Sequence, residues 1–276
     1  MAGSVADDPK DIVRRGYDEL SLRYRADDDT PANYAGWFHE LTERLVHPGA
    51  RVLDLGCGCG VPLARDLSVA GYRVTGVDIS DVQIERATRL VPGAELIRAD
   101  ATNADFPAGS FDAVVCLYTI IHVPLDEQEQ LLAKIATWLT TGGWLLLSAG
   151  YDSWTGTEGA WLGGSADMWW SQADRATYRR WITGAGLDVT DERYVPEGAS
   201  GHALFWGRRP SPAGPRDVPR GTPTTTDNEH RRPHRATAGP HQPGGAIGVD
   251  THQRPARCHT RRGAWGHDHF VHHLLR

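Results

Sequence analysis

Glycine occupies every second position from Gly56 to Gly60, immediately after the mostly apolar run Val52–Leu55. Glycine adopts backbone conformations closed to other residues and lets a ligand approach the main chain closely. Open α/β sheets bind their ligands at the carboxyl ends of the strands, where such turns lie. The pattern therefore predicts a buried strand that runs directly into a ligand-binding turn.

Short runs rich in β-branched and apolar residues alternate with helical patterns from Arg51 to Arg209. This alternation is typical of an α/β domain, in which crossover helices join parallel strands. We expect strands at residues 51–55, 72–77, 95–98, 111–117, 144–147, 187–195 and 202–208. We expect helices at residues 61–70, after the capping residue Ser80, from Asp126 to a stop at Gly142-Gly143, and from Ser171 to about Thr183.

The regions that flank or interrupt this alternation have a different composition. Residues 9–46 carry apolar and aromatic residues in a helical pattern, so we expect a helical cap at residues 1–48 and a domain at 49–210. The connection at residues 151–170 holds Trp154, Trp161, Trp169 and Trp170, too many for an ordinary loop. We interpret this connection as a substrate lid, with burial of the same side chains in the core as the alternative.

The charge of the chain is divided unevenly between its body and its last 66 residues. Residues 211–276 hold ten Arg, no Lys and five acidic residues, so this tail carries +5 while the net charge of the whole chain is −6. Its Pro, Arg and His content cannot bury enough apolar surface to offset the cost of ordering, and we expect disorder. The same composition also fits a GC-rich gene translated in the wrong frame, which makes a frameshifted end an alternative.

A second acidic signal follows the next predicted strand. Asp78 stands 24 residues after Asp54, at a strand end where a carboxylate can accept the hydrogens of both ribose hydroxyls. A dinucleotide fingerprint would need glycine at the sixth position of the turn, which is Val61. An acid at position 54 would repel a pyrophosphate but would hold the charged amino-acid end of a ligand. The spacing favours a cationic nucleoside that bears an amino acid.

These motifs resemble those of the class I S-adenosylmethionine-dependent methyltransferases, in the small-molecule branch known as methyltransferase type 11 or ubiquinone/menaquinone-type. The resemblance spans residues 11–209 and rests on residues 52–60, 76–80, 98–101, 111–116, 139–147 and 184–187. It implies a Rossmann-like, doubly wound α/β fold with an N-terminal helical cap. Its sheet would have seven strands in the order 3-2-1-4-5-7-6, mostly parallel with an antiparallel last strand.

The resemblance also implies S-adenosylmethionine as the cofactor and S-adenosylhomocysteine as the product. Asp78 would hold the ribose hydroxyls, Asp54 would lie near the methionine end, and Asp100 would reach the adenine edge. The implied cofactor residues are Tyr17, Tyr24, Asp54, Gly56, Gly58, Gly60, Asp78, Ile79, Asp100, Ala101 and Leu117. A plain turn role for Asp100 and core packing for the two tyrosines are the alternatives.

His122 follows the fourth predicted strand, on the side where the methyl group would emerge. A neutral imidazole there could remove a proton from the acceptor, and a structural cap of the loop before the next helix is the alternative. Methyl transfer often needs no strong base, because alignment supplies much of the rate. We expect Trp37, Tyr118 and the lid tryptophans to contact an aromatic acceptor.

The sequence thus predicts a cytoplasmic S-adenosylmethionine-dependent methyltransferase for O, N or C of a small aromatic or heterocyclic metabolite of specialised metabolism. Two of the four cysteines share the glycine-rich turn, which suits a reducing compartment, and no apolar run approaches the roughly 18 residues that cross a membrane. The alternatives are a macromolecular methyltransferase that uses the basic tail on RNA or protein, and a non-catalytic cofactor-binding protein. We expect neither a bound metal nor nucleic acid, because the tail offers its His and Arg no fixed scaffold.

Overall fold

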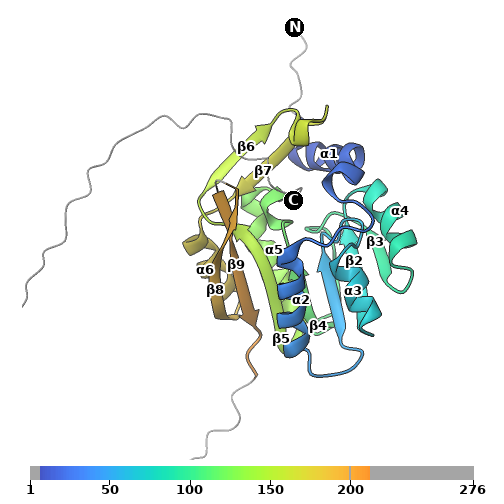
Figure 1. Cartoon of the computed structure of the whole chain (residues 1–276). Helices are drawn as coiled ribbons and strands as arrows, with labels where there is room; N and C mark the ends of the chain where they lie inside the picture. The colour runs from blue at the N-terminus through green and yellow to red at the C-terminus, as the bar shows by residue number, and fades with distance from the viewer. Residues whose placement is uncertain (1–6, 199, 212–276) are drawn as a thin grey trace, which may run out of the picture. The chain divides into compact units, whose positions relative to one another are not determined.

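The computed structural model describes residues 7–198 and 200–211 (Figure 1). The chain divides into two units, residues 1–212 with 268–276 and residues 213–267, and every described residue belongs to the first. The predictions of a disordered or frameshifted tail concern residues that, apart from Ser211, lie outside the described part.

A seven-stranded sheet forms the centre of the described residues. Its strands are β1 (Arg51–Leu55), β2 (Arg73–Asp78), β3 (Glu95–Arg98), β4 (Phe111–Cys116), β5 (Leu139–Gly150), β8 (Asp188–Glu197) and β9 (Ser200–Arg208). They lie in the order β3-β2-β1-β4-β5-β9-β8, and the pairings among β1 to β5 are parallel. β9 runs antiparallel to both β5 and β8. The predicted fold class, strand order and antiparallel last strand are confirmed.

Helices cover both faces of this sheet. They are α1 (Pro9–Tyr24), α2 (Ala32–Arg44), α3 (Leu63–Val69), α4 (Asp81–Leu90), α5 (Leu125–Trp138) and α6 (Arg175–Gly184). The capping prediction for α4 holds, because the Ser80 hydroxyl accepts a hydrogen bond from the Gln83 N–H. The residues between Pro9 and Arg44 form two helices, as expected.

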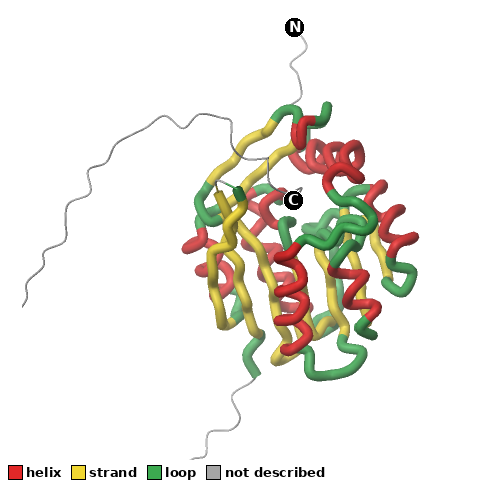
Figure 2. Tube along the Cα trace, viewed as in Figure 1, coloured by secondary structure: helices red, strands yellow, loops and turns green. Residues whose placement is uncertain are grey.

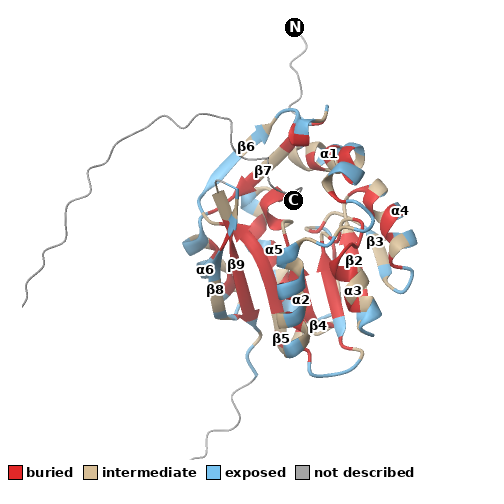
Figure 3. Cartoon of the chain, in the orientation of Figure 1, coloured by how far each residue is buried: buried red, intermediate tan, exposed pale blue. Residues whose placement is uncertain are grey.

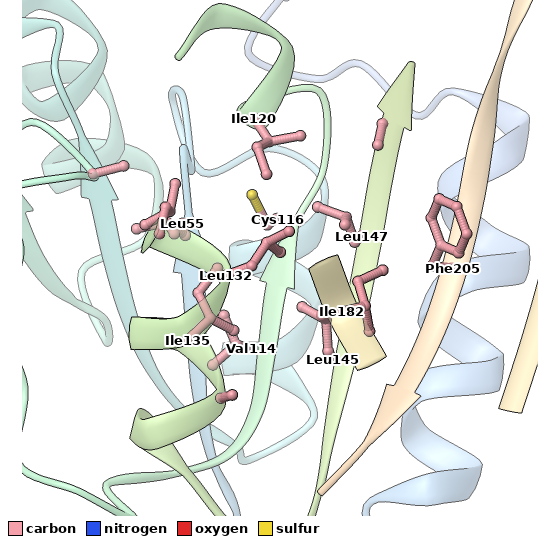
Figure 4. Packing of buried hydrophobic residues seen from close by; sticks show 14 of the residues in the cluster. Leu55, Val114, Cys116, Ile120, Leu132, Ile135, Leu145, Leu147, Ile182 and Phe205 are labelled. Carbon is pink, nitrogen blue, oxygen red and sulfur yellow. The ribbon is translucent and has the colours of Figure 1, made fainter. Parts of the chain in front are cut away.

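Alternation along the strands divides the core into two layers. Leu53 and Leu55 belong to a buried cluster that includes residues of α5 and α6, whereas Val52 belongs to one that includes residues of α2 and α3. Figure 3 shows the central strands as the most buried part of the fold, and Figure 4 shows Leu55 and Ile135 in the first cluster. Because both faces are covered, the central strands are apolar almost throughout, which explains their clear signal in the sequence.

The prediction that the helix starting at Asp126 ends at Gly142-Gly143 is wrong. Helix α5 ends at Trp138, and β5 begins with the next residue. The two glycines lie inside β5, where Gly142 N–H donates to the Arg209 carbonyl and Arg209 N–H donates to the Gly143 carbonyl. The pairing of β5 with β4 shifts between Phe111 and Ala113, so this stretch is an irregular strand end instead of a helix cap.

The connection after β5 contains a hairpin that the sequence analysis missed. Strands β6 (Trp154–Glu158) and β7 (Met168–Gln172) pair antiparallel, with a short 3-10 helix η2 (Trp161–Gly163) between them. The expected helix start at Ser171 is therefore wrong, because β7 continues to Gln172 and α6 begins at Arg175 after the capping residue Asp174. β7 contacts both α1 and η1 (Ile120–His122).

Within the described residues, every helix is too short or too polar to traverse a lipid bilayer.

Candidate functional site

A cavity lies at the carboxyl ends of β1 to β4, next to α1. It comprises about 680 Å³ of space, including the part open to solvent. Figure 2 shows α1 and the β6–β7 hairpin at the end of the sheet where β1 to β4 have their carboxyl ends. The lining residues are Lys10, Val13, Tyr17, Tyr24, Gly56, Gly58, Val77, Asp78, Ile79, Ala99, Asp100, Ala101, Leu117, Tyr118, Thr119, His122 and Val123.

The glycine-rich turn forms one wall of this cavity. Gly56 has φ +79° and Gly58 has φ +55°, conformations that favour glycine. A Cβ on Gly56 would lie 1.8 Å from Thr119 Oγ1, whereas a Cβ on Gly58 would meet no protein atom within 4 Å. Gly60 does not line the cavity, and a Cβ there would lie 2.7 Å from Val91. The first two glycines thus shape the cavity, and the third lets the turn pack against the end of α4.

Replacing Gly56 with alanine is expected to lower the free energy of unfolding by about 3 kcal/mol, because backbone strain adds to the clash with Thr119. Gly109→Ala is the matched control: Gly109 also has positive φ, +70°, but its Cβ would meet nothing within 4 Å. The control should lose only about 1 kcal/mol. Urea unfolding of the two variants measures the difference, and equal losses would contradict the role assigned to Thr119.

Asp78 is fixed by the backbone around it. Its Oδ2 accepts the Gly58 N–H at 2.8 Å, and its Oδ1 accepts the Ser80 N–H at 2.9 Å. Burial raises the pKa of Asp78 to about 6, although these backbone hydrogen bonds oppose the shift. Each oxygen keeps a further lone pair, so the carboxylate can accept two more hydrogen bonds from a ligand in the cavity.

A second cavity of about 430 Å³ shares Tyr24, Gly56, Gly58 and Leu117 with the first. Asp54 and Arg25 both line it, so a carboxyl group and a guanidinium group border the same space. Burial, together with the nearby Asp78 charge, raises the pKa of Asp54 to about 7. A cavity bordered by one acid and one base is complementary to the ammonium and carboxylate of an amino acid.

Sequence analysis did not find Arg25. The side chain of Arg25 is almost fully buried, with its guanidinium 3.2 Å from Asp29 and over the rings of Tyr24 and Tyr34. It follows the end of α1, about 30 residues from the glycine-rich turn, and no local motif connects the two. Its position between two tyrosines that border the same cavity is visible only in three dimensions.

Asp100 is held at the edge of the first cavity by a lysine that the sequence analysis also missed. Lys10 Nζ, from the first turn of α1, lies 2.8 Å from Asp100 Oδ2 and also bonds Thr102 and Glu127. Burial acts to raise the pKa of Asp100, but the Lys10 and Thr102 hydrogen bonds outweigh it and lower the pKa. This ion pair connects the start of α1 to the loop after β3.

His122 lines the first cavity with both ring nitrogens engaged. Its Nδ1 lies 2.8 Å from the Trp169 carbonyl oxygen, which can only accept, so Nδ1 carries the proton. Nε2 therefore accepts a hydrogen bond from the Tyr17 hydroxyl at 3.0 Å. Burial lowers the pKa of His122 to about 4, so the imidazole is neutral near pH 7.

The residues predicted to contact the acceptor lie in different parts of the structure. Tyr118 lines the first cavity, but none of the five tryptophans named in the sequence analysis lines either cavity. Trp161 is buried against Tyr17 and Tyr24, and the Trp170 ring lies 4.3 Å from the His122 ring. Trp37 is buried in the core cluster that includes α2 and α3. Trp169 packs against the buried cluster that includes Val13 and Leu20 of α1, and Trp154 is exposed.

Residues 52–143, about a third of the chain, match the family described as a methyltransferase domain. A ubiquinone biosynthesis O-methyltransferase from Bordetella pertussis is 33% identical over 119 residues, which are 41% of this chain and 47% of that protein. The 27-O-demethylrifamycin SV methyltransferase of Amycolatopsis mediterranei is 34% identical over 131 residues, 44% of this chain and 47% of that one. The chain thus spans less than half the length of these curated relatives.

A solved structure has a similar fold. Magnesium protoporphyrin IX methyltransferase from Synechocystis, crystallised with bound S-adenosylhomocysteine, has a TM-score of 0.58 and 21% identity, covering 73% of this chain and 100% of that one. Residues 52–143 are thus similar to methyltransferase domains, and the fold of the described residues is similar to that of a methyltransferase crystallised with S-adenosylhomocysteine.

Proposed function

We propose that the whole chain is an S-adenosylmethionine-dependent methyltransferase that acts on a small aromatic or heterocyclic metabolite of specialised metabolism in the cytoplasm. The observation that carries this proposal is the pair of joined cavities, one with Asp78 and one with Asp54 and Arg25. Their donors and acceptors fit a nucleoside that carries an amino acid. We retain the proposed division into a helical cap at 1–48 and a catalytic domain at 49–210.

The residues present fit this cofactor. In our proposal Asp78 holds the ribose hydroxyls, while Ile79, Ala101 and the Asp100 carboxylate border the adenine. Asp54 and Arg25 hold the ammonium and carboxylate of the methionine part, beside Leu117. When bound, the cofactor would supply an electrophilic methyl group, and its sulfur would keep the electrons of the broken carbon–sulfur bond. Tyr17 and Tyr24, on α1, line the cavity and help to exclude water from it.

The small-molecule acceptor is supported by the names of two relatives, a ubiquinone biosynthesis O-methyltransferase and a 27-O-demethylrifamycin SV methyltransferase. The proposed acceptor contacts are Tyr118 and the lid connection at 151–170, together with Trp37. His122 as a base would require the Tyr17 hydroxyl to leave Nε2 first. The acceptor atom in this proposal is oxygen, nitrogen or carbon.

Calorimetric titration of the full chain with S-adenosylhomocysteine tests the cofactor assignment, and we expect a dissociation constant in the micromolar range. Transfer of a labelled methyl group to a panel of phenols, indoles, amines and carboxylates then tests catalysis. Binding without transfer to any member would favour a non-catalytic cofactor-binding protein. Transfer to RNA or protein in place of the panel would favour the macromolecular alternative. The absence of both a heat of binding and a thermal stabilisation by S-adenosylhomocysteine would overturn the proposal.

A further inference from the structure

Tyr118, Glu197 and His202 form a polar cluster beside the first cavity. The Tyr118 hydroxyl donates to Glu197 Oε1, and His202 Nε2 lies 3.1 Å from Glu197 Oε2. The rings of Tyr118 and His202 meet edge to face with their centroids 5.2 Å apart. Glu197 ends β8 and His202 lies near the start of β9, so the hairpin at the edge of the sheet brings both residues to Tyr118.

The His202 imidazole has one ring nitrogen in use and one free. His202 is 8% exposed, and its Nδ1 is buried without a hydrogen-bond partner among the described residues. Because the Glu197 carboxylate only accepts, Nε2 of the neutral ring carries the proton and Nδ1 carries a free lone pair. A buried acceptor without a donor is costly, unless another molecule supplies the donor.

Tyr118 connects this lone pair to the cavity. It lines the cavity and packs on His202, and it has φ +56°, a conformation that is rare for a bulky residue and is concentrated at functional sites. Its N–H is held by Ser148 Oγ, while its ring stands near the rings of Tyr34 and Trp37. His202 itself lines neither cavity, so an acceptor would reach Nδ1 only after a side-chain movement, which we assign to Tyr118.

The two imidazoles near the end of β4 thus differ in what they can do. His122 has both nitrogens engaged, by the Trp169 carbonyl and by the Tyr17 hydroxyl. His202 has a carboxylate at one nitrogen and, among the described residues, no hydrogen-bond partner at the other, which is buried. An imidazole backed by a carboxylate is the arrangement by which a general base is held in one tautomer and its cationic form is stabilised.

We propose that His202 is the base that binds the acceptor, and that the acceptor is an aromatic compound methylated at an O–H or N–H group. This inference rests on the proposed methyltransferase function. As the acceptor atom forms its bond to the methyl carbon, the bond from that carbon to sulfur breaks with its electron pair left on sulfur, and the hydrogen of the acceptor leaves as a proton to Nδ1. The electron pair of the broken bond to hydrogen stays on the acceptor atom. Glu197 acts as a positioning residue, and the Tyr34, Trp37 and Tyr118 rings provide the aromatic surroundings.

Nitrogen-15 NMR of the full chain labelled at histidine tests the state of His202 without any acceptor. The signals of His202 are identified by their loss in His202→Gln. We expect a protonated Nε2 and an unprotonated Nδ1, and we expect Glu197→Gln to mix the two tautomers. A proton on Nδ1 in the wild-type protein would overturn the proposal, whether or not an acceptor is known.

Kinetics with the best acceptor of the panel test the chemical role. His202→Gln should lower kcat at least 30-fold with the affinity for S-adenosylhomocysteine unchanged, and the loss should shrink for nitrophenols, which ionise without a base. Glu197→Gln should lower kcat in the same way, with partial recovery in Glu197→Asp. His39→Gln is the matched control, because His39 also faces a carboxylate, Glu43, but is exposed on α2.

The outcomes separate the two proposals. Absence of S-adenosylhomocysteine binding would end the methyltransferase proposal itself. Three results would overturn the role of His202 and leave the enzyme class intact. They are full activity of His202→Gln in a protein that binds S-adenosylhomocysteine normally, a loss of activity confined to His122→Gln, and methylation of carbon acceptors only.

Discussion

Asp78→Ala is expected to weaken the binding of S-adenosylhomocysteine at least about 100-fold, equivalent to about 3 kcal/mol. The substitution would remove the proposed ribose contacts together with the two hydrogen bonds that the Asp78 carboxylate accepts from the Gly58 and Ser80 N–H groups. Calorimetric titration measures the loss. Asp81→Ala is the control, because Asp81 lies three residues later, is exposed and pairs with Arg98 outside both cavities.

The raised pKa of Asp78 also leads us to expect that ligand binding depends on pH. Burial raises the pKa of Asp78 to about 6, so the empty site holds a growing fraction of the protonated form as the pH falls through this value. Hydroxyl donors bind the ionised form better, and Asp54, whose pKa is raised to about 7, adds to the effect, so affinity should fall progressively from about pH 8 to pH 5. Affinity that stays constant from pH 8 to pH 5 would contradict the assignment of the ribose to Asp78.

The sheet and half of the site were predictable from the sequence, for a physical reason. Strands buried on both faces are continuous apolar runs, and their ends were marked by Gly56, Gly58 and Asp78, residues whose roles depend on backbone that is local in sequence. The carboxyl ends of neighbouring parallel strands must meet at one edge. The position of Asp78 beside the glycine-rich turn followed from these facts, whereas the strand order was implied by the resemblance to class I methyltransferases.

The contacts that depend on distant segments were not predictable. Lys10 reaches Asp100 across 90 residues, and Arg25 reaches the Asp54 cavity from the end of α1. No spacing in the sequence encodes such pairs. The hairpin β6–β7 was missed because its tryptophans suggested a lid, and two of them, Trp169 and Trp170, are adjacent in β7 and so give no alternating strand pattern. Glu197 and His202 meet only because β8 and β9 pair, so neither stood out as a chemical motif.

Asp54→Asn is expected to make the protein without cofactor more stable and, at the same time, a poorer binder. The pKa of Asp54 is raised to about 7 by burial and by the Asp78 charge, well above the value of an unfolded chain. The folded state therefore holds this proton more tightly, and the stability contributed by the protonated carboxyl is lost as the pH rises towards 7. Above that pH the wild-type protein carries a costly buried charge, which asparagine lacks.

Urea unfolding at pH 8 should accordingly show Asp54→Asn more stable than the wild type by on the order of 2–4 kcal/mol, with a smaller difference at pH 5. The exposed Asp188, replaced by Asn, serves as the control and should show neither effect. Binding of S-adenosylhomocysteine should weaken at least about tenfold, because the ligand ammonium loses its ionic partner. If the substitution were to destabilise the protein at pH 8, Asp54 would be a structural residue instead of a site kept charged for its ligand. Opposite signs for stability and affinity are the signature of a binding group that the fold tolerates at a cost.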